Sequence, residues 1–309
     1  MGIDILQTHA LRESCEHALA QRFIVHKLHE APDRKRLLAE IGTSVRAIAG
    51  GQVSAGLMDQ LPNLQLIANF GVGYDSIDVA AAASRGIRVT NTPDVLNDAM
   101  AEITIGLMIA HARRLPEADK FVRAGRWPSG NFYLGHELKG RTVGIVGLGR
   151  IGKEIALRAQ AMKMRVVYHG RNQQADQPYS FYPDLLDMAR DADWLVVVTP
   201  GGAGTQKLIS RAVLEALGPG GIFVNVARGT VVDQSALVEL LGNGKLGGAA
   251  LDVFEDEPNV PEALLSMNNV VLSPHQGSAT HEARDAMGAL VVANLEAHFA
   301  GKPLLTPVV

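Results

Sequence analysis

The stretch Gly147-Leu148-Gly149-Arg150-Ile151-Gly152 has glycine at its first, third and sixth positions and lies between a predicted strand and a predicted helix. The apolar run Val143-Gly144-Ile145-Val146 precedes it, and an amphipathic pattern follows. In this context the first glycine allows a tight turn, the second lets the backbone approach a ligand, and the third lets the helix pack on the strand. Amides at the helix N-terminus then bind an anion. The loop predicts a dinucleotide site; a purely structural glycine turn is the alternative.

Short apolar runs alternate with helical patterns on both sides of this loop, which is typical of β-α-β units and a parallel sheet covered on both faces. The predicted class is α/β, with two doubly wound parallel sheets: a Rossmann-type cofactor domain and a smaller flavodoxin-like substrate domain. The earlier sheet is expected from strands at residues 3–6, 23–28, 45–49, 64–69 and 88–90. The later sheet is expected from six strands at residues 142–146, 165–168, 194–199, 221–226, 249–253 and 270–272.

Two long helical patterns stand outside this alternation. Asp94 to Arg126 is predicted to be one long helical stretch that bridges two domains or forms a partner interface. Glu282 to Phe299 is predicted to be the final helix. A linker is expected near Asn91-Thr92-Pro93, because proline biases the residue before it toward extended geometry.

Composition argues against several classes of partner. A chain of 309 residues with 47% hydrophobic residues and a net charge of -3 has a substantial core and no basic face for nucleic acid. The N-terminus lacks the pattern of a secretory signal, and the most apolar run, residues 103–110, is too short to cross a bilayer. We therefore expect a cytoplasmic protein with a small-molecule partner, no nucleic acid, no membrane and no metal. The single cysteine, Cys15, has no expected role.

The residues after the second strand of the later sheet indicate which dinucleotide binds. An acid about 20 residues beyond the glycine loop would accept hydrogen bonds from the ribose of NAD. Here Gly170 stands at that place, Arg171 follows, and the first acid, Asp176, lies further on. An arginine fork pairs well with a 2′-phosphate. NADP(H) is therefore favoured and NAD(H) stays possible, with a solvated surface arginine beside an NAD site as the alternative.

Three polar residues each follow a predicted strand, at the edge of the sheet where ligands of such folds bind. They are Arg228, Glu257 and His275. Taken alone, each residue also fits a purely structural role: Arg228 as an ion-pair residue, Glu257 as a surface acid and His275 as a loop histidine. Together they suit hydride transfer to a 2-oxo acid, which needs a cation for the carboxylate and an acid for the carbonyl oxygen. Arg228 and His275 fill these roles, and Glu257 beside the imidazole favours its protonated form.

Several ordered motifs resemble the D-isomer-specific 2-hydroxyacid dehydrogenase family almost from end to end. They are Gly147 to Gly152, Asn225-Val226-Ala227-Arg228-Gly229, Leu251-Asp252-Val253-Phe254 through Glu257-Pro258, Ser273-Pro274-His275, Asn69-Phe70-Gly71-Val72-Gly73-Tyr74-Asp75, and Asn91-Thr92-Pro93-Asp94-Val95-Leu96. The segment Tyr168-His169-Gly170-Arg171 is similar to that of NADP-preferring glyoxylate/hydroxypyruvate reductases and hydroxyphenylpyruvate reductases.

The resemblance implies a substrate domain at 1–95 and 285–309, a dinucleotide-binding domain at 96–284, a substrate cleft between them and a homodimer held largely by the cofactor domains. It also implies that amides around Val72 and Gly73 bind the substrate carboxylate, together with Arg228 and His275. For Thr104, a hydroxyl bonded to its own helix is equally expected. The full set of expected cofactor residues is Gly147, Leu148, Gly149, Arg150, Ile151, Gly152, Gly170, Arg171, Asn172, Thr199, Val226, Ala227, Asp252 and Thr104.

The substrate stays open at this stage. The small residues of Ala49-Gly50-Gly51 leave room for glyoxylate, hydroxypyruvate or aryl-pyruvates, and Trp127 either packs between helices or reaches a neighbouring subunit. A dinucleotide-sensing protein similar to the family's corepressor branch is a further alternative, although the chain keeps all three catalytic residues. A formate or phosphite dehydrogenase is also similar in fold, but formate dehydrogenases pair the histidine with glutamine rather than with an acid such as Glu257.

Overall fold

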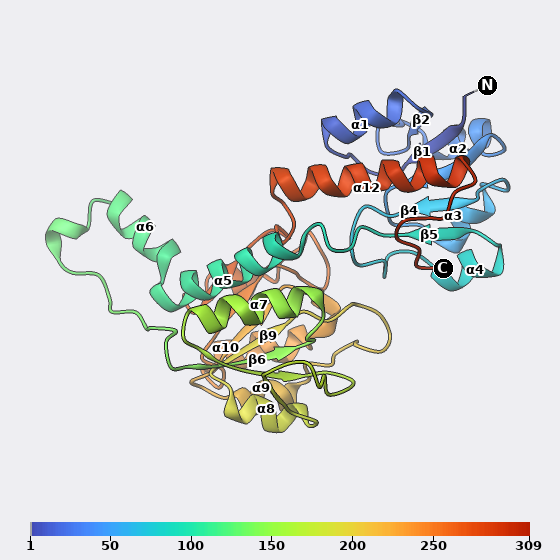
Figure 1. Ribbon diagram of the computed structural model, residues 1–309. Coiled ribbons are helices and arrows are strands. Elements are labelled where there is room, and N and C mark those ends of the chain that lie inside the picture. The colour runs from blue at the N-terminus through green and yellow to red at the C-terminus, as the bar shows by residue number, and fades with distance from the viewer. Residues whose placement is uncertain (1) are drawn as a thin grey trace. The chain divides into compact units, whose positions relative to one another are not determined.

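The computed structural model describes residues 2–309, which divide into two compact units (Figure 1). One unit runs to Leu96 and includes Thr280–Val309, and the other is Asn97–Ala279. The chain therefore returns to the first unit at Thr280 rather than at residue 285. Each unit contains one parallel sheet with helices, so the predicted α/β class and the two doubly wound sheets are confirmed.

The first unit has a five-stranded sheet in the order β2-β1-β3-β4-β5, which is the flavodoxin-like order. Its strands are β1 (Asp4–Gln7), β2 (Ile24–Lys27), β3 (Val45–Ala49), β4 (Leu66–Ala68) and β5 (Arg88–Thr90). All five lie where the sequence predicted strands. The order reverses between β1 and β3, so the switch point of this sheet lies at the carboxyl ends of these two strands.

Helices cover both faces of this sheet. They are α1 (Glu13–Ala20), α2 (Arg34–Ile41), α3 (Ala55–Asp59), α4 (Val79–Ser84) and α12 (His281–Phe299). The predicted final helix is thus α12, and it lies beside α1 in Figure 1. Cys15 of α1 is buried beside Gly288 of α12, where an added Cβ would lie 2.7 Å from the cysteine Cβ. Burial, together with nearby Glu16, raises the pKa of the Cys15 thiol to about 11.

The second unit has seven strands rather than the six predicted, in the order β12-β11-β10-β9-β6-β7-β8. They are β6 (Thr142–Val146), β7 (Arg165–His169), β8 (Ser180–Phe181), β9 (Trp194–Val197), β10 (Ile222–Asn225), β11 (Gly248–Leu251) and β12 (Val270–Leu272). The sequence missed β8, because a pair of residues is too short for a periodic apolar signal. The order is that of a Rossmann-type sheet, with its switch point between β6 and β9.

The long helical stretch predicted from Asp94 to Arg126 is wrong as one element. The structure has α5 (Asn97–Arg113) and α6 (Leu115–Arg123), separated by Arg114 in the left-handed region at φ 53°. Pro116 explains the break, because it has no N–H and its ring would clash with the carbonyl of Ala112. That carbonyl instead accepts a hydrogen bond from the His136 amide. Helix α5 packs beside α7 (Arg150–Ala161), as Figure 1 shows.

The remaining helices of the second unit are α8 (Leu185–Asp191), α9 (Arg211–Leu217), α10 (Gln234–Gly242) and α11 (Glu262–Leu265), with short 3-10 turns at Trp127–Ser129 and Gly229–Val231. Two apolar clusters lie on the two faces of the sheet. One includes Ile145, Ile155 and Met108, and the other includes Phe223, Leu214 and Leu240. Both faces are therefore covered, as expected for a parallel sheet.

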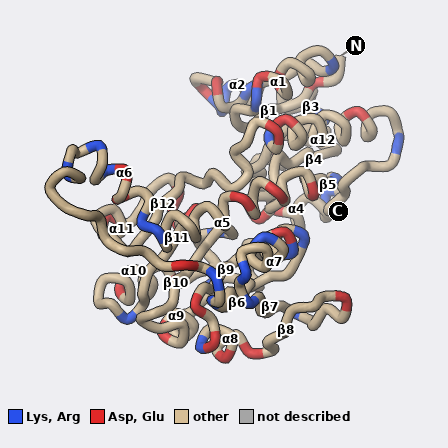
Figure 2. The backbone as a smooth tube through the Cα atoms, turned by 60° about the vertical axis from the view of Figure 1, so that its left-hand side comes forward, with Lys and Arg blue, Asp and Glu red and all other residues tan. Residues whose placement is uncertain are grey.

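Charged residues of both signs are mixed along each unit (Figure 2). Among residues 2–309, no helix combines the length and apolar character that a bilayer-spanning segment needs. In the same residues, no three His, Cys, Asp or Glu side chains come together as metal ligands.

Candidate active site

The predicted phosphate loop joins β6 to α7. Gly147 has φ 101°, which a residue with a side chain rarely adopts, and an added Cβ there would lie 3.0 Å from the Thr199 side chain. A Cβ on Gly152 would come within 2.2 Å of the Gly147 carbonyl oxygen, so only glycine lets α7 begin this close to the loop. Gly149, the residue before the helix, has nothing within 4 Å of its Cβ position. The loop is thus packed at its first and last glycines and open at the middle one.

Thr199 supplies an independent sign that a polar ligand belongs at this loop. It follows β9, across the switch point from Gly147. Its hydroxyl oxygen is buried and has no hydrogen-bond partner within the described part of the chain. Because buried polar groups are nearly always paired, this hydroxyl fits a bound dinucleotide that supplies the missing partner.

Arg171 lies after β7, where the sequence predicted it, and its side chain is exposed. Within residues 2–309 no carboxylate pairs with it, whereas Asp176, the first acid beyond it, lies 3.8 Å from Lys153. Sequence reasoning missed Gln174, whose side chain donates to the Leu148 carbonyl at 2.7 Å. Gln174 thus ties the segment that carries Arg171 to the phosphate loop. Gln174 lies on a loop three positions after Arg171, and no local sequence pattern indicates this contact.

Arg228 lies just beyond the end of β10, after Val226 and Ala227, at the carboxyl edge of the sheet, and is partly buried. Buried Asn225 shapes this turn: its amide donates to the Arg228 carbonyl at 2.9 Å, and its oxygen accepts from the Ala227 amide at 3.0 Å. The next residue, Gly229, touches Phe254 so closely that an added Cβ would lie 1.9 Å from the Phe254 carbonyl carbon. The arginine turn is therefore fixed against the segment that leads to Glu257.

His275 and Glu257 form the pair that the sequence predicted. The imidazole Nδ1 lies 2.6 Å from Glu257 Oε2, while Glu257 Oε1 accepts a hydrogen bond from the Phe254 amide at 3.0 Å. With Nδ1 engaged, Nε2 is the ring nitrogen that can face a substrate. The contacts run from Gly229 through Phe254 and Glu257 to His275, and so bring the three predicted catalytic residues into one region of the second unit.

Asp252 organises the loop that carries His275. Its carboxylate is buried and accepts three hydrogen bonds, from the Ser273 hydroxyl at 2.7 Å, the Gln276 amide at 2.7 Å and the Gly277 amide at 2.8 Å. Its carbonyl accepts from the His275 amide at 2.9 Å. The family resemblance implies only that Asp252 is a cofactor residue, and this role stays a prediction. The structure adds its role as the residue that positions the histidine loop.

Three further predicted residues, Thr104, Val72 and Gly73, lie in segments whose hydrogen bonds are made within their own unit. Thr104 is fully buried in α5, and its hydroxyl donates to the Met100 carbonyl at 2.6 Å, which is the local alternative; a cofactor contact stays a prediction. Val72 and Gly73 lie in the turn after β4 of the first unit. There Asn69 donates to the Gly73 carbonyl at 2.9 Å and Asn91 donates to the Val72 carbonyl at 2.9 Å. Because the carbonyls are held in this way, the amides of the turn are fixed in direction.

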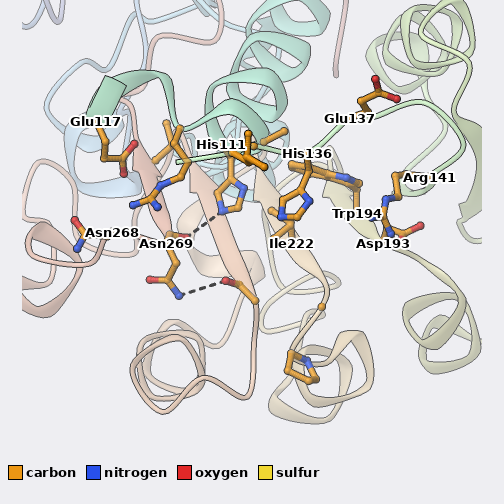
Figure 3. A pocket seen from close by; sticks show the side chains of 18 residues that line it. His111, Glu117, His136, Glu137, Arg141, Asp193, Trp194, Ile222, Asn268 and Asn269 are labelled. Carbon is orange, nitrogen blue, oxygen red and sulfur yellow. Dashed lines mark hydrogen bonds and ion pairs between the residues drawn. The ribbon is translucent and has the colours of Figure 1, made fainter. Parts of the chain in front are cut away.

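A pocket of about 590 Å³ lies at the other edge of the seven-stranded sheet, at the amino ends of the strands (Figure 3). Its wall includes His111 and Trp194, whose rings meet edge to face. His111 Nε2 lies 3.1 Å from the Asn269 carbonyl oxygen, and Arg141 pairs with Asp193 at 3.0 Å. None of the predicted site residues lines this pocket. It is therefore separate from the candidate active site.

A Rossmann-type sheet with a fitting phosphate loop, and with an arginine and a histidine–carboxylate pair at its carboxyl edge, defines a class of nicotinamide-dependent oxidoreductases. Residues 105–277 match the family model of the D-isomer specific 2-hydroxyacid dehydrogenase NAD binding domain. The chain belongs to the D-isomer-specific 2-hydroxyacid dehydrogenase family, whose members are NAD(P)-dependent enzymes acting on small 2-hydroxy or 2-oxo acids.

Two relatives and one solved structure match this chain over its whole length. A glyoxylate/hydroxypyruvate reductase of Arabidopsis thaliana is 46% identical, covering 100% of this chain and 99% of the relative. A hydroxyphenylpyruvate reductase of Plectranthus scutellarioides is 45% identical with the same coverage. The structure of an NADPH-dependent glyoxylate/hydroxypyruvate reductase from Sinorhizobium meliloti, in complex with NADP and malonate, is 46% identical. It matches with a TM-score of 0.95 and covers 100% of this chain and 97% of that chain.

Proposed function

We propose that the protein uses NADPH to reduce a small 2-oxo acid of the glyoxylate/hydroxypyruvate class to the D-2-hydroxy acid, and that it catalyses the reverse oxidation. The observation that carries this proposal is the His275–Glu257 pair at 2.6 Å, fixed by the Asp252 loop and joined through Phe254 to the Arg228 turn. An acid, its orienting carboxylate and a cation are what this reaction needs.

In the proposed reaction, the Arg228 guanidinium binds the substrate carboxylate and polarises the carbonyl. When bound, the reduced nicotinamide supplies the hydride that reaches C2. His275 Nε2 gives its proton to the carbonyl oxygen as the C=O double bond becomes a single bond, and Glu257 stabilises the protonated imidazole beforehand. In the oxidation the same nitrogen takes the proton back. The amides of Val72 and Gly73 in the first unit are proposed to bind the substrate carboxylate as well.

NADP(H) is the proposed cofactor because Gly170 replaces the acid that an NAD site would use and Arg171 has no carboxylate partner among residues 2–309. Arg171→Ala is expected to weaken NADPH binding by about 1.5–3 kcal/mol, the value of hydrogen bonds to a charged group, and to leave NADH binding nearly unchanged. Fluorescence titration of each cofactor measures this without turnover. Arg190→Ala is the matched control, since Arg190 is an exposed arginine paired with Asp187 in the same unit. Equal losses for both cofactors would contradict the 2′-phosphate role.

The test of the proposed function is NADPH oxidation with glyoxylate, hydroxypyruvate and phenylpyruvate as separate substrates. We expect the two small acids to be turned over. Phenylpyruvate is the competing substrate because a hydroxyphenylpyruvate reductase is 45% identical over the full chain. A clear preference for phenylpyruvate would establish this alternative, and no turnover with any of the three acids would favour a dinucleotide-sensing protein.

The proposed enzyme is a cytoplasmic homodimer. Support for the dimer comes from α6, which has no buried residue and exposes Leu115 and Val122. Trp127, Tyr133 and Leu134 after it are also exposed, and Figure 1 shows this segment extending away from the sheet of its own unit. Light scattering is expected to give twice the chain mass, and Val122→Asp is expected to shift the mass toward the monomer. A monomer in the unmodified protein would overturn this part of the proposal.

A further inference from the structure

The first unit contains a cluster of cationic and aromatic side chains to which nothing above assigns a role. It consists of His9 after β1, Phe70 after β4 and Arg284 in the first turn of α12. The Arg284 guanidinium carbon lies 5.6 Å from the centre of the Phe70 ring, and the His9 ring meets the same ring edge-on at 6.3 Å. The two basic side chains therefore flank one phenyl ring.

The cluster lies at the switch point of the five-stranded sheet. His9 comes after β1, and the Gly50-Gly51 turn comes after β3, the neighbouring strand across the switch point. The two loops touch: the Thr8 hydroxyl donates to the Gly51 carbonyl at 2.8 Å, and a Cβ on Gly50 would lie 3.0 Å from the His9 ring. Ligands of open α/β sheets bind outside the carboxyl ends of the strands at this point.

Arg284 has no carboxylate partner among residues 2–309, although its side chain is partly buried. The nearby carboxylate of Asp285 is already engaged by Arg12 at 2.7 Å and by the Ser14 hydroxyl at 2.6 Å. The position in the first helical turn is also unfavourable for a cation, because the helix N-terminus is itself positive. Burial lowers the pKa of the Arg284 guanidinium. A partly desolvated charge without a counter-charge is less stable than a paired one, and an electron-rich ligand atom would supply the missing partner.

His9 adds a second polar group with spare hydrogen-bonding capacity. Its Nδ1 lies 3.3 Å from the Thr8 hydroxyl, and no partner of its Nε2 occurs within the described residues. Burial lowers the pKa of His9, and the neighbouring His29 and Arg284 lower it further. The imidazole is therefore uncharged near pH 7. It complements the arginine as a hydrogen-bonding group rather than as a second charge.

We propose that Arg284 and His9 determine substrate specificity by binding an acceptor oxygen at C3 or beyond in the 2-oxo acid, either a hydroxyl or a second carboxylate. This inference rests on the proposed function. It ranks hydroxypyruvate and oxaloacetate above pyruvate, which has only a methyl group there, and above phenylpyruvate. An aryl group would remove more water from the guanidinium and return no hydrogen bond. Glyoxylate has no C3 substituent, so we expect its kcat/KM not to depend on the cluster.

The first experiment compares substrates within one enzyme preparation. In the unmodified enzyme we expect kcat/KM for hydroxypyruvate to exceed that for pyruvate by about 10- to 100-fold, the range of a charged hydrogen bond. Arg284→Gln is expected to remove most of this ratio while glyoxylate reduction stays within about threefold of the unmodified enzyme. The ratio does not depend on the fraction of folded enzyme, so partial misfolding of the variant does not obscure it. Arg36→Gln is the control, since Arg36 is exposed in the same unit and pairs with Glu40.

A second experiment does not need turnover. Tartronate is a hydroxylated dicarboxylate without a reducible carbonyl, and titration calorimetry is expected to show it bound about tenfold more weakly by Arg284→Gln and by His9→Ala than by the unmodified protein. Unchanged tartronate binding, or an unchanged hydroxypyruvate to pyruvate ratio, overturns the assignment. Absence of turnover with every 2-oxo acid counts instead against the proposed function, and in that case the tartronate titration still decides the role of Arg284.

Discussion

His275→Ala is expected to lower kcat for the reduction of hydroxypyruvate by about 10²–10⁴-fold, the contribution of a positioned general acid, and to leave NADPH binding within about twofold. The reason is that the Nε2 proton is needed mainly as the carbonyl oxygen gains charge in the transition state. Steady-state loss of NADPH absorbance gives kcat, and fluorescence titration gives cofactor affinity. His17→Ala is a suitable control because His17 is an exposed histidine on α1 of the first unit, with a side-chain hydrogen bond to Gln21.

Glu257→Gln separates the orienting role from the acid role. The glutamine keeps a group near His275 Nδ1, 2.6 Å from the carboxylate in the structure, but it removes the negative charge that stabilises the protonated ring. The kcat for reduction by this variant is therefore expected to be lower than that of the unmodified enzyme. Near-normal kcat in His275→Ala, or an unchanged kcat in Glu257→Gln, would exclude this pair as the proton donor and its orienting partner.

Arg228→Lys is the second change with a large expected effect. A lysine keeps the positive charge, but its ammonium is a point charge and cannot bind a carboxylate and a carbonyl oxygen with the planar fork of arginine. Loss of one charged hydrogen bond costs about 1.5–3 kcal/mol, so kcat/KM for hydroxypyruvate is expected to fall by roughly 10- to 150-fold. Arg211→Lys in α9 is the matched control, because that exposed arginine pairs with Glu239 on the protein surface.

If Arg228→Lys retained near-normal kcat/KM, the bidentate contact would be refuted even though a purely electrostatic role would survive. The position of Arg228 makes that outcome unexpected. Asn225 and Gly229 fix the turn on both sides of it, so its backbone has little freedom to bring a shorter or differently shaped head group to the same place.

The phosphate loop and the strand-end residues could be predicted from the sequence because their signals are local. Gly147 and Gly152 follow an apolar strand and open an amphipathic helix, and this context alone specifies a turn and a close approach. The pairing of His275 with Glu257 followed from a geometric rule, since the carboxyl ends of parallel strands meet at one edge. The confirmed fold class rests on the same alternation of strands and helices.

Other features depend on contacts between distant segments, which no local pattern specifies. Asp252 holds the histidine loop through hydrogen bonds to Ser273, Gln276 and Gly277, and nothing near Asp252 in the sequence indicates those partners. The helix break at Arg114 could not be predicted from the apolar periodicity alone. The single proline at position 116 causes it. Likewise, β8 forms only because β7 offers a free edge beside it.

The backbone of His275 has φ 52°, a conformation that costs a residue with a side chain about 1 kcal/mol and that glycine or asparagine adopts more easily. The proposed acid therefore lies at a position where selection for thermal stability alone would choose another residue. If His275 is the acid, activity and thermal stability favour different residues at this position, and a screen for stabilised variants would tend to replace this histidine. The Asp252 carboxylate accepts three hydrogen bonds from the same loop, and these bonds stabilise the unfavourable backbone conformation of His275.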